Sequence, residues 1–316
     1  MNLRATLLLL LAPPPIGAAP SAPEPRRRAD IEAVLAKAPK LTDADQARPL
    51  HVVLVADTKD HGRDEHDYPL WQQRWGRLFG GAPDGDSAAA PVHLFGPASS
   101  GTGNGHAGGL PNVRVSTAWQ WPSEAQWKSA DLVAAFCYVG WNETRFQELE
   151  SHLSRGGGFT LIHSATWTKP GPSLRVAALT GVGGFTRWRE GTIELTVDTR
   201  HPIGLGLPER IRLLDETYWP PSPAVEPGVA QVIATSEESV QGETGITGPQ
   251  PMFWAHPHGK GRVFGCVPGH STWTFDDPYF RLLLLRGMAW SAGGSPYRFD
   301  PLVLRGARVV ATPPSE

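Results

Sequence analysis

Short apolar runs alternate with amphipathic segments through the middle of the chain. These runs predict buried β-strands at residues 51–57, 131–139 and 159–162. Two intervening segments, 68–79 and 142–155, carry apolar residues at helical spacing, and Asn142 suits the N-cap of the second. Strand, helix and strand in this order predict a mostly parallel sheet with helices on both faces.

The pattern changes in the second half of the chain, where apolar and polar positions alternate. The alternation at 192–197 predicts a half-exposed strand, and further strands are expected at 229–235 and 262–267. Asp277 followed by Pro278 predicts the start of a last helix. We therefore expect an α/β fold in which some antiparallel strands are added to the parallel sheet.

Segments rich in small and polar residues mark the boundaries of this domain. Residues 80–109, with many Gly, Ala, Pro and Ser, predict a long loop around a short strand at 92–95. The domain is expected to span 49–293, after a linker at 23–48 and before a loosely attached coil at 294–316. A chain of 316 residues with 40% hydrophobic side chains can bury a sizeable core.

The first residues have the layout of a secretory signal peptide. Arg4 gives a small positive region, an apolar run follows at 5–12, and small residues occur from Gly17 to Ala22. The apolar run is too short to span a membrane. We expect cleavage of residues 1–22 and export to a bacterial periplasm or beyond. The alternative is a disordered Ala/Pro leader that stays attached.

Charge and cysteine content narrow the range of functions. The chain has 29 basic and 31 acidic side chains and a net charge of -2, which indicates no nucleic-acid partner and no attraction to a charged membrane surface. Its two cysteines, Cys137 and Cys266, lie within apolar runs. Packed thiols are the expected state there, and a disulfide between neighbouring strands is the alternative. Neither stands in a sequence typical of a nucleophilic thiol.

Histidines follow three of the predicted strands. His61 and His66 occupy the loop after the first strand, His163 ends the third, and His270 follows the last. The carboxyl ends of parallel strands meet at one edge of a sheet, where ligands bind. We therefore expect these four imidazoles to hold a divalent metal, zinc or another transition metal.

Each histidine also has a plainer interpretation. The loop histidines could be solvated, and His163 could bond only to the backbone at the end of its strand. His201 is expected to be structural, and His256 and His258 are expected in a hairpin turn. If several of these histidines lie close together at one edge of the sheet, the metal site is favoured over these plainer interpretations.

Carboxylates and aromatic rings lie close to these histidines in the sequence. Glu65 precedes His66, and Glu216 stands in the segment 215–219; either carboxylate could act as a general base or a metal ligand. Solvated acids at a strand edge are the alternative. Aromatic faces form platforms for flat or sugar-like ligands. The rings chosen here for substrate binding are Tyr68, Trp141, Trp167, Trp219 and Trp273.

Several of these motifs together resemble the ThuA-like, or trehalose utilisation, family. The segments that carry the resemblance are 59–68, 156–167, 201–207, 215–219 and 259–293. The resemblance implies the flavodoxin-like fold of class I glutamine amidotransferases. In those enzymes a nucleophilic Cys occupies the sharp turn that holds His163 here. The thioester route is therefore closed, and amidotransferase activity is not expected.

The resemblance also implies a role in the breakdown of small carbohydrates, namely trehalose and related disaccharides, particularly after their oxidation to 3-keto sugars. We hypothesise that a metal held by the four histidines polarises the keto oxygen, and that Glu216 or Glu65 removes the neighbouring proton. Lys59 would stabilise the charge of the enolate. Elimination followed by hydration would then cleave the sugar. His163 is expected to take part in catalysis as well as in metal binding.

Two other functions stay open at the level of the sequence. The chain could be a secreted carbohydrate-binding or accessory module that keeps the fold without catalysis. It could also be a hydrolase of another small metabolite that uses the same histidines. Metal content and a panel of sugar substrates would separate these three functions.

Overall fold

The structure is a computed structural model of the chain, and it describes residues 21–80, 91–95, 109–223, 229–239 and 247–311. Within these ranges the chain forms a mixed sheet of nine strands, with a separate pair of short strands beside it. One half of the large sheet is parallel and the other half is antiparallel. The predicted α/β class, a mostly parallel core with added antiparallel strands, is therefore confirmed.

The parallel half of the sheet has the strand order of a flavodoxin-like fold. From the edge inward it contains β3 (Val113–Trp119), β2 (Leu50–Ala56), β4 (Leu132–Ala135), β5 (Gly158–Ile162) and β10 (Gly261–Cys266). In chain order this is the second, first, third, fourth and fifth parallel strand, the arrangement typical of flavodoxin-like sheets. Every residue of β2, β4 and β5 is buried, because helices cover both faces. This explains the continuous apolar runs.

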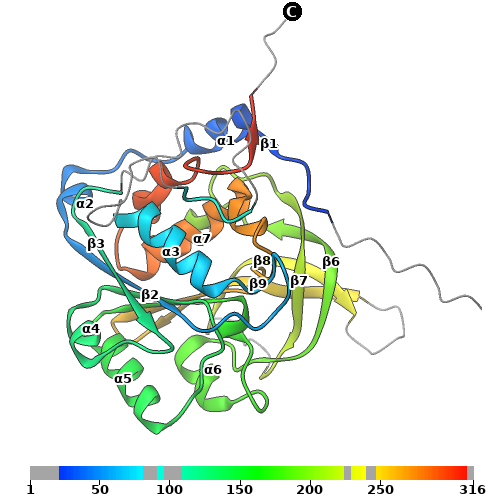
Figure 1. Ribbon diagram of the computed structural model, residues 1–316. Coiled ribbons are helices and arrows are strands. Elements are labelled where there is room, and N and C mark those ends of the chain that lie inside the picture. The colour runs from blue at the N-terminus through cyan, green and yellow to red at the C-terminus, as the bar shows by residue number, and fades with distance from the viewer. Residues whose placement is uncertain (1–20, 81–90, 96–108, 224–228, 240–246, 312–316) are drawn as a thin grey trace, which may run out of the picture.

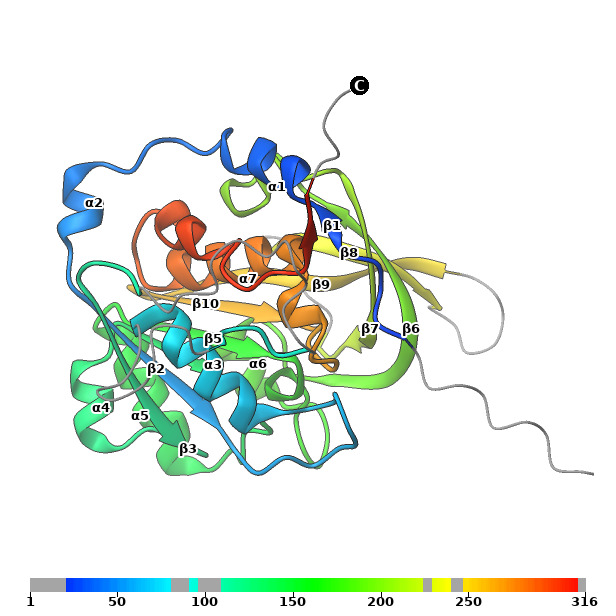
Figure 2. The same cartoon turned by 45° about the horizontal axis from the view of Figure 1, so that its top comes forward.

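The antiparallel half extends the sheet beyond β10. It contains β9 (Thr247–His258), β8 (Gln231–Ser239), β6 (Phe185–Val197) and β7 (Arg210–Pro221), in that order. β6 and β7 pair over most of their length and form a long curved ribbon at the end of the sheet, seen in Figures 1 and 2. We call this ribbon the β6–β7 arm. It brings side chains from β6 and β7 to the carboxyl edge of the parallel strands.

Helices lie on both faces of the parallel half, as Figure 1 shows. On one face are α3 (Tyr68–Gly80) and α7 (Pro278–Ser291), and on the other are α4 (Glu124–Ser129), α5 (Glu143–Ser154) and α6 (Leu174–Thr180). Each of β2, β3 and β4 is joined to the next parallel strand by a crossover that contains a helix, so these strands point the same way. No helix in the described ranges is long and apolar enough to cross a membrane.

Two predicted helix starts are confirmed in atomic detail. The Asn142 side chain accepts a hydrogen bond from the backbone N–H of Arg145 and caps α5. The Asp277 carboxylate accepts from the N–H groups of Tyr279 and Phe280, and Pro278 follows as the first residue of α7. These caps fix the ends of helices whose apolar sides pack on the sheet.

The N-terminal segment 23–48 belongs to the fold, which corrects the expected linker. It contains α1 (Arg28–Leu35) and α2 (Asp43–Ala47). Ile31 and Val34 of α1 are buried in the main core. Two apolar residues three positions apart form too short a pattern to predict a helix, so the sequence did not reveal it. The predicted signal peptide at 1–22 lies almost wholly outside the described residues.

The described part of the C-terminal segment 294–316 is also packed, although a loose coil was expected. It forms the 3₁₀ segment η4 (Pro296–Leu302), and Phe299 within it is fully buried. Farther on, β11 (Val309–Val310) pairs in parallel with β1 (Arg26–Arg27). The two ends of the domain therefore hold each other against α7 (Figure 1).

The expected strand at 92–95 is not present. Residues 91–95 are irregular, and the backbone N–H groups of Leu94 and Phe95 donate to the buried carboxylate of Asp276. A side chain thus satisfies the amides that a neighbouring strand would have bonded. The rest of the loop predicted at 80–109 lies largely outside the described residues.

Both cysteines are packed thiols, as expected. Cys137 and Cys266 are free and buried. Burial raises the pKa of the Cys137 thiol to about 12 and that of Cys266 well above its ordinary value. Neither is a nucleophilic thiolate near neutral pH.

Candidate metal centre and the adjoining cavities

His163 stands on a sharp turn at the carboxyl end of β5. It is the first residue of a short 3₁₀ turn, η1 (His163–Thr166), and its backbone has the left-handed φ of 49°. Side chains other than Gly rarely adopt this conformation, and such residues cluster at functional sites. Gly269 passes so close that a Cβ there would lie 3.2 Å from the Cβ of His163. The turn aims the imidazole toward the carboxyl edge of the sheet.

His66 reaches the same point from the loop after β2. Its backbone also has a positive φ, 40°, and its N–H donates to the carbonyl of His270 at 2.9 Å. The N–H of Thr272 in turn donates to the carbonyl of Asp64 at 2.8 Å. The loops that carry His66 and His270 are therefore tied together by their backbones, and the His66 side chain is buried.

His270 is held in place by the buried carboxylate of Asp215. This carboxylate accepts hydrogen bonds from the N–H groups of Gly269 and His270, both at 2.9 Å, and from the hydroxyl of Thr274. A carboxylate bound by several N–H groups is a rigid anchor for a loop. Asp215 thus positions His270 from β7, while its neighbour Glu216 faces the histidines.

Three imidazole nitrogens and one carboxylate oxygen converge at this point. The Nε2 atom of His66 lies 2.8 Å from Nε2 of His163 and 3.1 Å from Nδ1 of His270. The Oε2 atom of Glu216 lies 3.1 Å from Nε2 of His163 and 3.2 Å from Nδ1 of His270. All four side chains are buried, and their donor atoms lie within 4.8 Å of one another. We call these residues the His₃Glu cluster.

The partners of two histidines determine which nitrogen carries the proton. Nδ1 of His163 lies 2.7 Å from the carbonyl oxygen of Val267, which can only accept, so this nitrogen is the donor. Nδ1 of His66 lies 2.9 Å from the Asp60 carboxylate, which can only accept, and 2.8 Å from the Tyr68 hydroxyl, which donates its own proton to the other Asp60 oxygen; this nitrogen is therefore also the donor. In the neutral rings both Nε2 atoms therefore carry lone pairs, and these face each other. Two such lone pairs at 2.8 Å repel; the Tyr218 hydroxyl, 2.8 Å from Nε2 of His163, can donate to one of them, and a cation between the nitrogens would relieve the repulsion fully. The donor set fits a transition-metal ion.

The electrostatics of the cluster favour a neutral His66 and an ionised Glu216, whereas they favour a proton on His270. Burial and the neighbouring imidazoles of His163 and His270 lower the pKa of His66 strongly. Burial alone would raise the pKa of Glu216, but its hydrogen bonds to the two histidines hold that pKa well below the usual range. For His270 burial opposes the charged form, yet the bond to Glu216 and nearby acids raise its pKa. A proton at His270 would compete with a metal ion.

Asp60 links the cluster to two further residues. One of its oxygens, Oδ1, lies 2.8 Å from Nδ1 of His61 and 2.9 Å from Nδ1 of His66, and the other accepts from the Tyr68 hydroxyl at 3.2 Å. His61, predicted as a ligand, lies beside the cluster and outside its buried set; it forms a second, more exposed group with Asp60 and His66. Tyr68 lies behind His66 with its ring against Phe136.

A cavity of about 310 Å³ opens directly over the cluster. Its aromatic wall contains Trp167, whose ring meets Tyr218 edge to face at 4.9 Å, and Trp188, which lies opposite Tyr218 in the β6–β7 arm. Trp188 is 59% exposed, an unusual state for so large an apolar ring. The complete lining is His61, His66, Tyr138, Trp167, Trp188, Glu190, Glu216, Tyr218 and His270.

A smaller pocket of about 160 Å³ adjoins this cavity. Glu190 and His270 line both, so they form the wall between the two. The remaining lining of the smaller pocket is Glu65, Gly191, Leu214, Asp215, Ser271 and Trp273. A small molecule made of two linked units could place one unit in each of these two spaces.

The five aromatic residues predicted to bind substrate are divided by the structure. Trp167 lines the larger cavity and Trp273 the smaller pocket. The other three lie away from both linings: Tyr68 is buried, Trp141 stacks on Phe146, and Trp219 donates its indole N–H to the carbonyl of Ser239. Of the five predicted rings, Trp167 and Trp273 therefore border a cavity.

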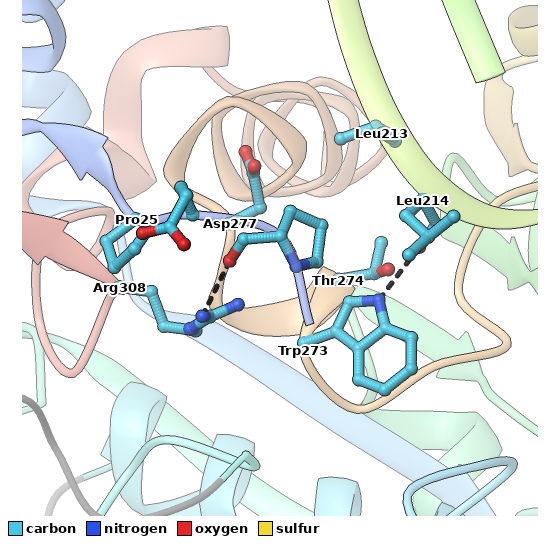
Figure 3. Close-up of a pocket in the computed structure, with 9 residues that line it drawn as sticks. Pro25, Leu213, Leu214, Trp273, Thr274, Asp277 and Arg308 are labelled. Carbon is cyan, nitrogen blue, oxygen red and sulfur yellow. Dashed lines mark hydrogen bonds between the residues drawn. The ribbon is translucent and has the colours of Figure 1, made fainter. Parts of the chain in front are cut away.

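Figure 3 shows the contacts that hold the Trp273 ring on the side that faces away from the smaller pocket. Its indole N–H donates to the carbonyl of Leu214 at 2.8 Å. The small space beside it, of about 10 Å³, is closed by Pro25 and by Arg308, whose guanidinium donates to the carbonyl of Pro23. This space has room for about one water molecule and is too small for a sugar. Pro25 and Arg308 thus support Trp273 in the outer wall of the smaller pocket.

The two remaining predicted residues lie in the loop that carries His66. The Lys59 ammonium donates to the backbone carbonyl of Glu65 and lies 3.5 Å from Asp67, so it braces the loop and lines neither cavity. The Glu65 carboxylate accepts from the N–H of Gly62 at 3.2 Å and lies 3.9 Å from Nε2 of His270. Lys59 is therefore poorly placed to reach a substrate, whereas Glu65 borders the smaller pocket.

The three histidines for which the sequence predicted plainer roles, His201, His256 and His258, lie outside the cluster. His201 caps η2 (Pro202–Gly204) and His256 bonds to the carbonyl of Val229. His256 and His258 stand at the end of strand β9, just before the turn in which they were expected. None of the three lies in the lining of either cavity.

Sequence reasoning missed several residues of the site. Asp60 and Asp215 were not among the predicted site residues, because a positioning role depends on contacts that spacing does not show. Trp188 and Glu190 lie in a part of β6 that is largely exposed, so no apolar alternation marked it as a strand. Tyr218 could have been found, since it stands two residues after Glu216 and so shares its face of β7.

Comparison with known proteins identifies the family. The family model for ThuA, described as trehalose utilisation, matches residues 106–291. The chain belongs to the ThuA family. This range contains His163, Glu216 and His270, whereas the loop that carries His66 precedes it. No curated protein matches the chain.

Solved structures support the same fold. A protein from Bacteroides uniformis ATCC 8492 described as ThuA-like is 16% identical, with a TM-score of 0.54, over 82% of this chain and 98% of its own. Another, from Parabacteroides merdae ATCC 43184, is 18% identical, with a TM-score of 0.50, over 78% of this chain and 92% of its own. At these identities the likeness shows a shared fold and carries no substrate with it.

Proposed function

We propose that this chain is a metal-dependent enzyme that cleaves a disaccharide or a 3-keto-glycoside. The observation that carries the proposal is the His₃Glu cluster, in which unprotonated nitrogens of His66 and His163 face each other. Imidazole nitrogen with one carboxylate oxygen is a donor set for zinc and other transition metals. His66, His163, His270 and Glu216 would hold the ion, which would supply Lewis-acid polarisation of a carbonyl oxygen.

The surroundings of the cluster support a sugar as the substrate. Trp167, Trp188 and Tyr218 form an aromatic wall on which the C–H face of a sugar ring can pack. Tyr138 adds a hydroxyl group that can bond to a sugar oxygen, whereas the Tyr218 hydroxyl lies 2.8 Å from Nε2 of His163. Burial raises the pKa of Tyr138 to about 12, so its hydroxyl is a neutral donor. A few polar groups in an aromatic cavity of about 310 Å³ are typical of a small-molecule site.

Amidotransferase chemistry does not suit this site. His163 occupies the turn at which a nucleophilic Cys would be needed, and neither cavity is lined by a thiol among the described residues. Cys266 is buried and its thiol donates to the carbonyl of Pro268. The fold is therefore used here for different chemistry.

A second candidate function is a carbohydrate-binding module without catalysis. The exposed ring of Trp188 favours it, because such rings are common platforms for sugars in proteins that only bind them. We further propose that the protein is exported, on the basis of the leader-like sequence at 1–22. The N-terminal sequence of the protein recovered from an exporting bacterial host tests this part.

A substrate panel separates the two functions. The purified chain, with and without added zinc, manganese or cobalt, is mixed with 3-keto disaccharides, ordinary disaccharides and small esters, and the products are followed by chromatography. Metal-dependent cleavage of the keto sugars supports the enzyme, and the variant His163→Ala should abolish it while the distant His258→Ala should not. Sugar binding without cleavage under any of these conditions would favour the module, and ester cleavage alone would favour another hydrolase.

A further inference from the structure

Glu190 occupies a special place in the β6–β7 arm. It lies directly opposite Glu216 in the antiparallel register, so both side chains project from the same face of the arm. Glu216 is buried among the histidines, whereas Glu190 is exposed at the rim. Glu190 also lines both the cavity over the cluster and the smaller pocket beside it.

The Glu190 carboxylate is free to react. Within the described part of the chain it makes no hydrogen bond and no ion pair, unlike the other two carboxylates near the cluster. Glu216 is held by His163 and His270, and Glu65 accepts from the N–H of Gly62. Two carboxylates directly opposite each other also destabilise a strand pair. A fold that keeps such a pair at its cavity accepts a cost in stability there, which is common where a residue serves function.

We propose that Glu190 is the catalytic residue that transfers protons during cleavage, a role that rests on the proposed function. The larger cavity would hold the keto unit beside the His₃Glu cluster, and the smaller pocket would hold the leaving unit against Trp273. The bond to be broken then crosses the wall that Glu190 forms. A single carboxylate at this wall can reach both the carbon next to the ketone and the glycosidic oxygen.

The proton transfers balance without any oxidant or reductant. The Glu190 carboxylate takes the proton from the carbon between the ketone and the anomeric carbon. The electron pair of that C–H bond forms a carbon–carbon double bond as the bond from the anomeric carbon to the glycosidic oxygen breaks. That oxygen takes the proton from Glu190 and leaves as an alcohol.

Hydration then completes the reaction. Water adds its oxygen to the anomeric carbon, Glu190 accepts a proton from this water, and Glu190 returns the proton to the carbon next to the ketone. The sum is one glycoside and one water converted into a free 3-keto sugar and an alcohol. Glu190 ends as the carboxylate with which it began.

The test compares Glu190→Gln with Glu194→Gln, a change of the same chemistry on the same strand. Glu194 is an exposed residue paired with Arg212 and lines neither cavity. Each purified protein is assayed for bound metal, for affinity toward a non-cleavable 3-keto glycoside by calorimetry, and for cleavage. Exchange of the proton next to the ketone is followed by NMR in D₂O.

We expect Glu190→Gln to lower kcat about 100-fold or more and to lower proton exchange in parallel, because a positioned acid–base group contributes about 100- to 10,000-fold. Metal content and ligand affinity should stay those of the wild type, and the thermal midpoint should be equal or higher. Formate should restore part of the activity of Glu190→Ala. Glu194→Gln should behave as wild type in every assay.

Two results would overturn the proposal in distinguishable ways. An active wild type whose Glu190→Gln variant keeps kcat within about threefold would remove Glu190 from the chemistry and leave the proposed function standing. A wild type that neither binds metal nor cleaves keto glycosides would overturn both proposals together. Loss of activity accompanied by loss of metal would show a structural role and would also overturn the catalytic one.

Discussion

Replacing Asp60 by Asn should weaken metal binding although Asp60 is not among the four proposed ligands. One oxygen of Asp60 faces Nδ1 of both His61 and His66 and thereby keeps the proton of His66 on that nitrogen. The introduced amide can present its NH₂ group to the same nitrogen, which favours the opposite tautomer. The His66 proton would then sit on Nε2, in the space that a metal ion needs.

The size of this effect follows from the contacts that are lost. Loss of the hydrogen-bonding partner of a metal-binding His lowers metal affinity about 10- to 100-fold, which is about 1.4 to 2.8 kcal/mol. The upper end of this range is expected, because Asp60 also accepts from the Tyr68 hydroxyl at 3.2 Å and so fixes a second neighbour of His66. Direct removal of the ligand in His66→Ala should cost more still.

Competition with a coloured chelator measures this affinity directly. The control is Asp57→Asn, which changes the same side chain at the start of the same loop; Asp57 accepts from Gln120 and has no bond to a histidine. We expect the control to bind zinc as the wild type does. The reasoning would be refuted by an Asp60→Asn affinity within about twofold of the wild type while His66→Ala loses the metal.

Three further predictions test other parts of the structure. Trp188→Ala should raise KM for a keto glycoside about tenfold with metal content unchanged, because it removes one face of the cavity wall; an unchanged KM would take Trp188 out of the binding site. Burial lowers the pKa of His152 to about 4, so protonation of the unfolded chain below about pH 6.5 should remove about 3 kcal/mol of stability as the pH falls to 4. Unfolding of His152→Gln in urea should therefore depend less on pH between 7 and 4, and equal dependence would contradict the assignment. A Cβ at Gly265 would lie 2.0 Å from the indole of Trp254. Gly265→Ala should therefore lower the free energy of unfolding by about 1 to 3 kcal/mol in a urea titration. An unchanged free energy of unfolding would contradict this prediction and show that neighbouring side chains rearrange without cost.

The parallel half of the fold could be predicted because its signals are local. Continuous apolar runs predicted β2, β4 and β5, a further strand was expected at the place of β10, and caps at Asn142 and Asp277 predicted the starts of α5 and α7. Once those strands are parallel, their carboxyl ends must share an edge, which is why His66, His163 and His270 could be expected near one another. Local pattern and general geometry were sufficient there.

The rest of the site depends on contacts between distant segments. Trp188 and Glu190 reach the cavity only because β6 and β7 curve over the edge of the sheet, and nothing in the sequence near them shows this. The roles of Asp60 and Asp215 depend likewise on hydrogen bonds made by the folded loops. The packed N-terminal segment was missed because α1 offers only Ile31 and Val34 as buried residues.

The central claim is that His66, His163, His270 and Glu216 hold one transition-metal ion. Its most direct test is X-ray absorption of the full chain loaded with zinc, together with metal analysis of the same sample. We predict one zinc per chain, bound by three imidazole nitrogens and a carboxylate oxygen at about 2.0 to 2.2 Å. His163→Ala should lose this ion. No stoichiometric zinc, or zinc that keeps the same ligands in His163→Ala, would contradict the account.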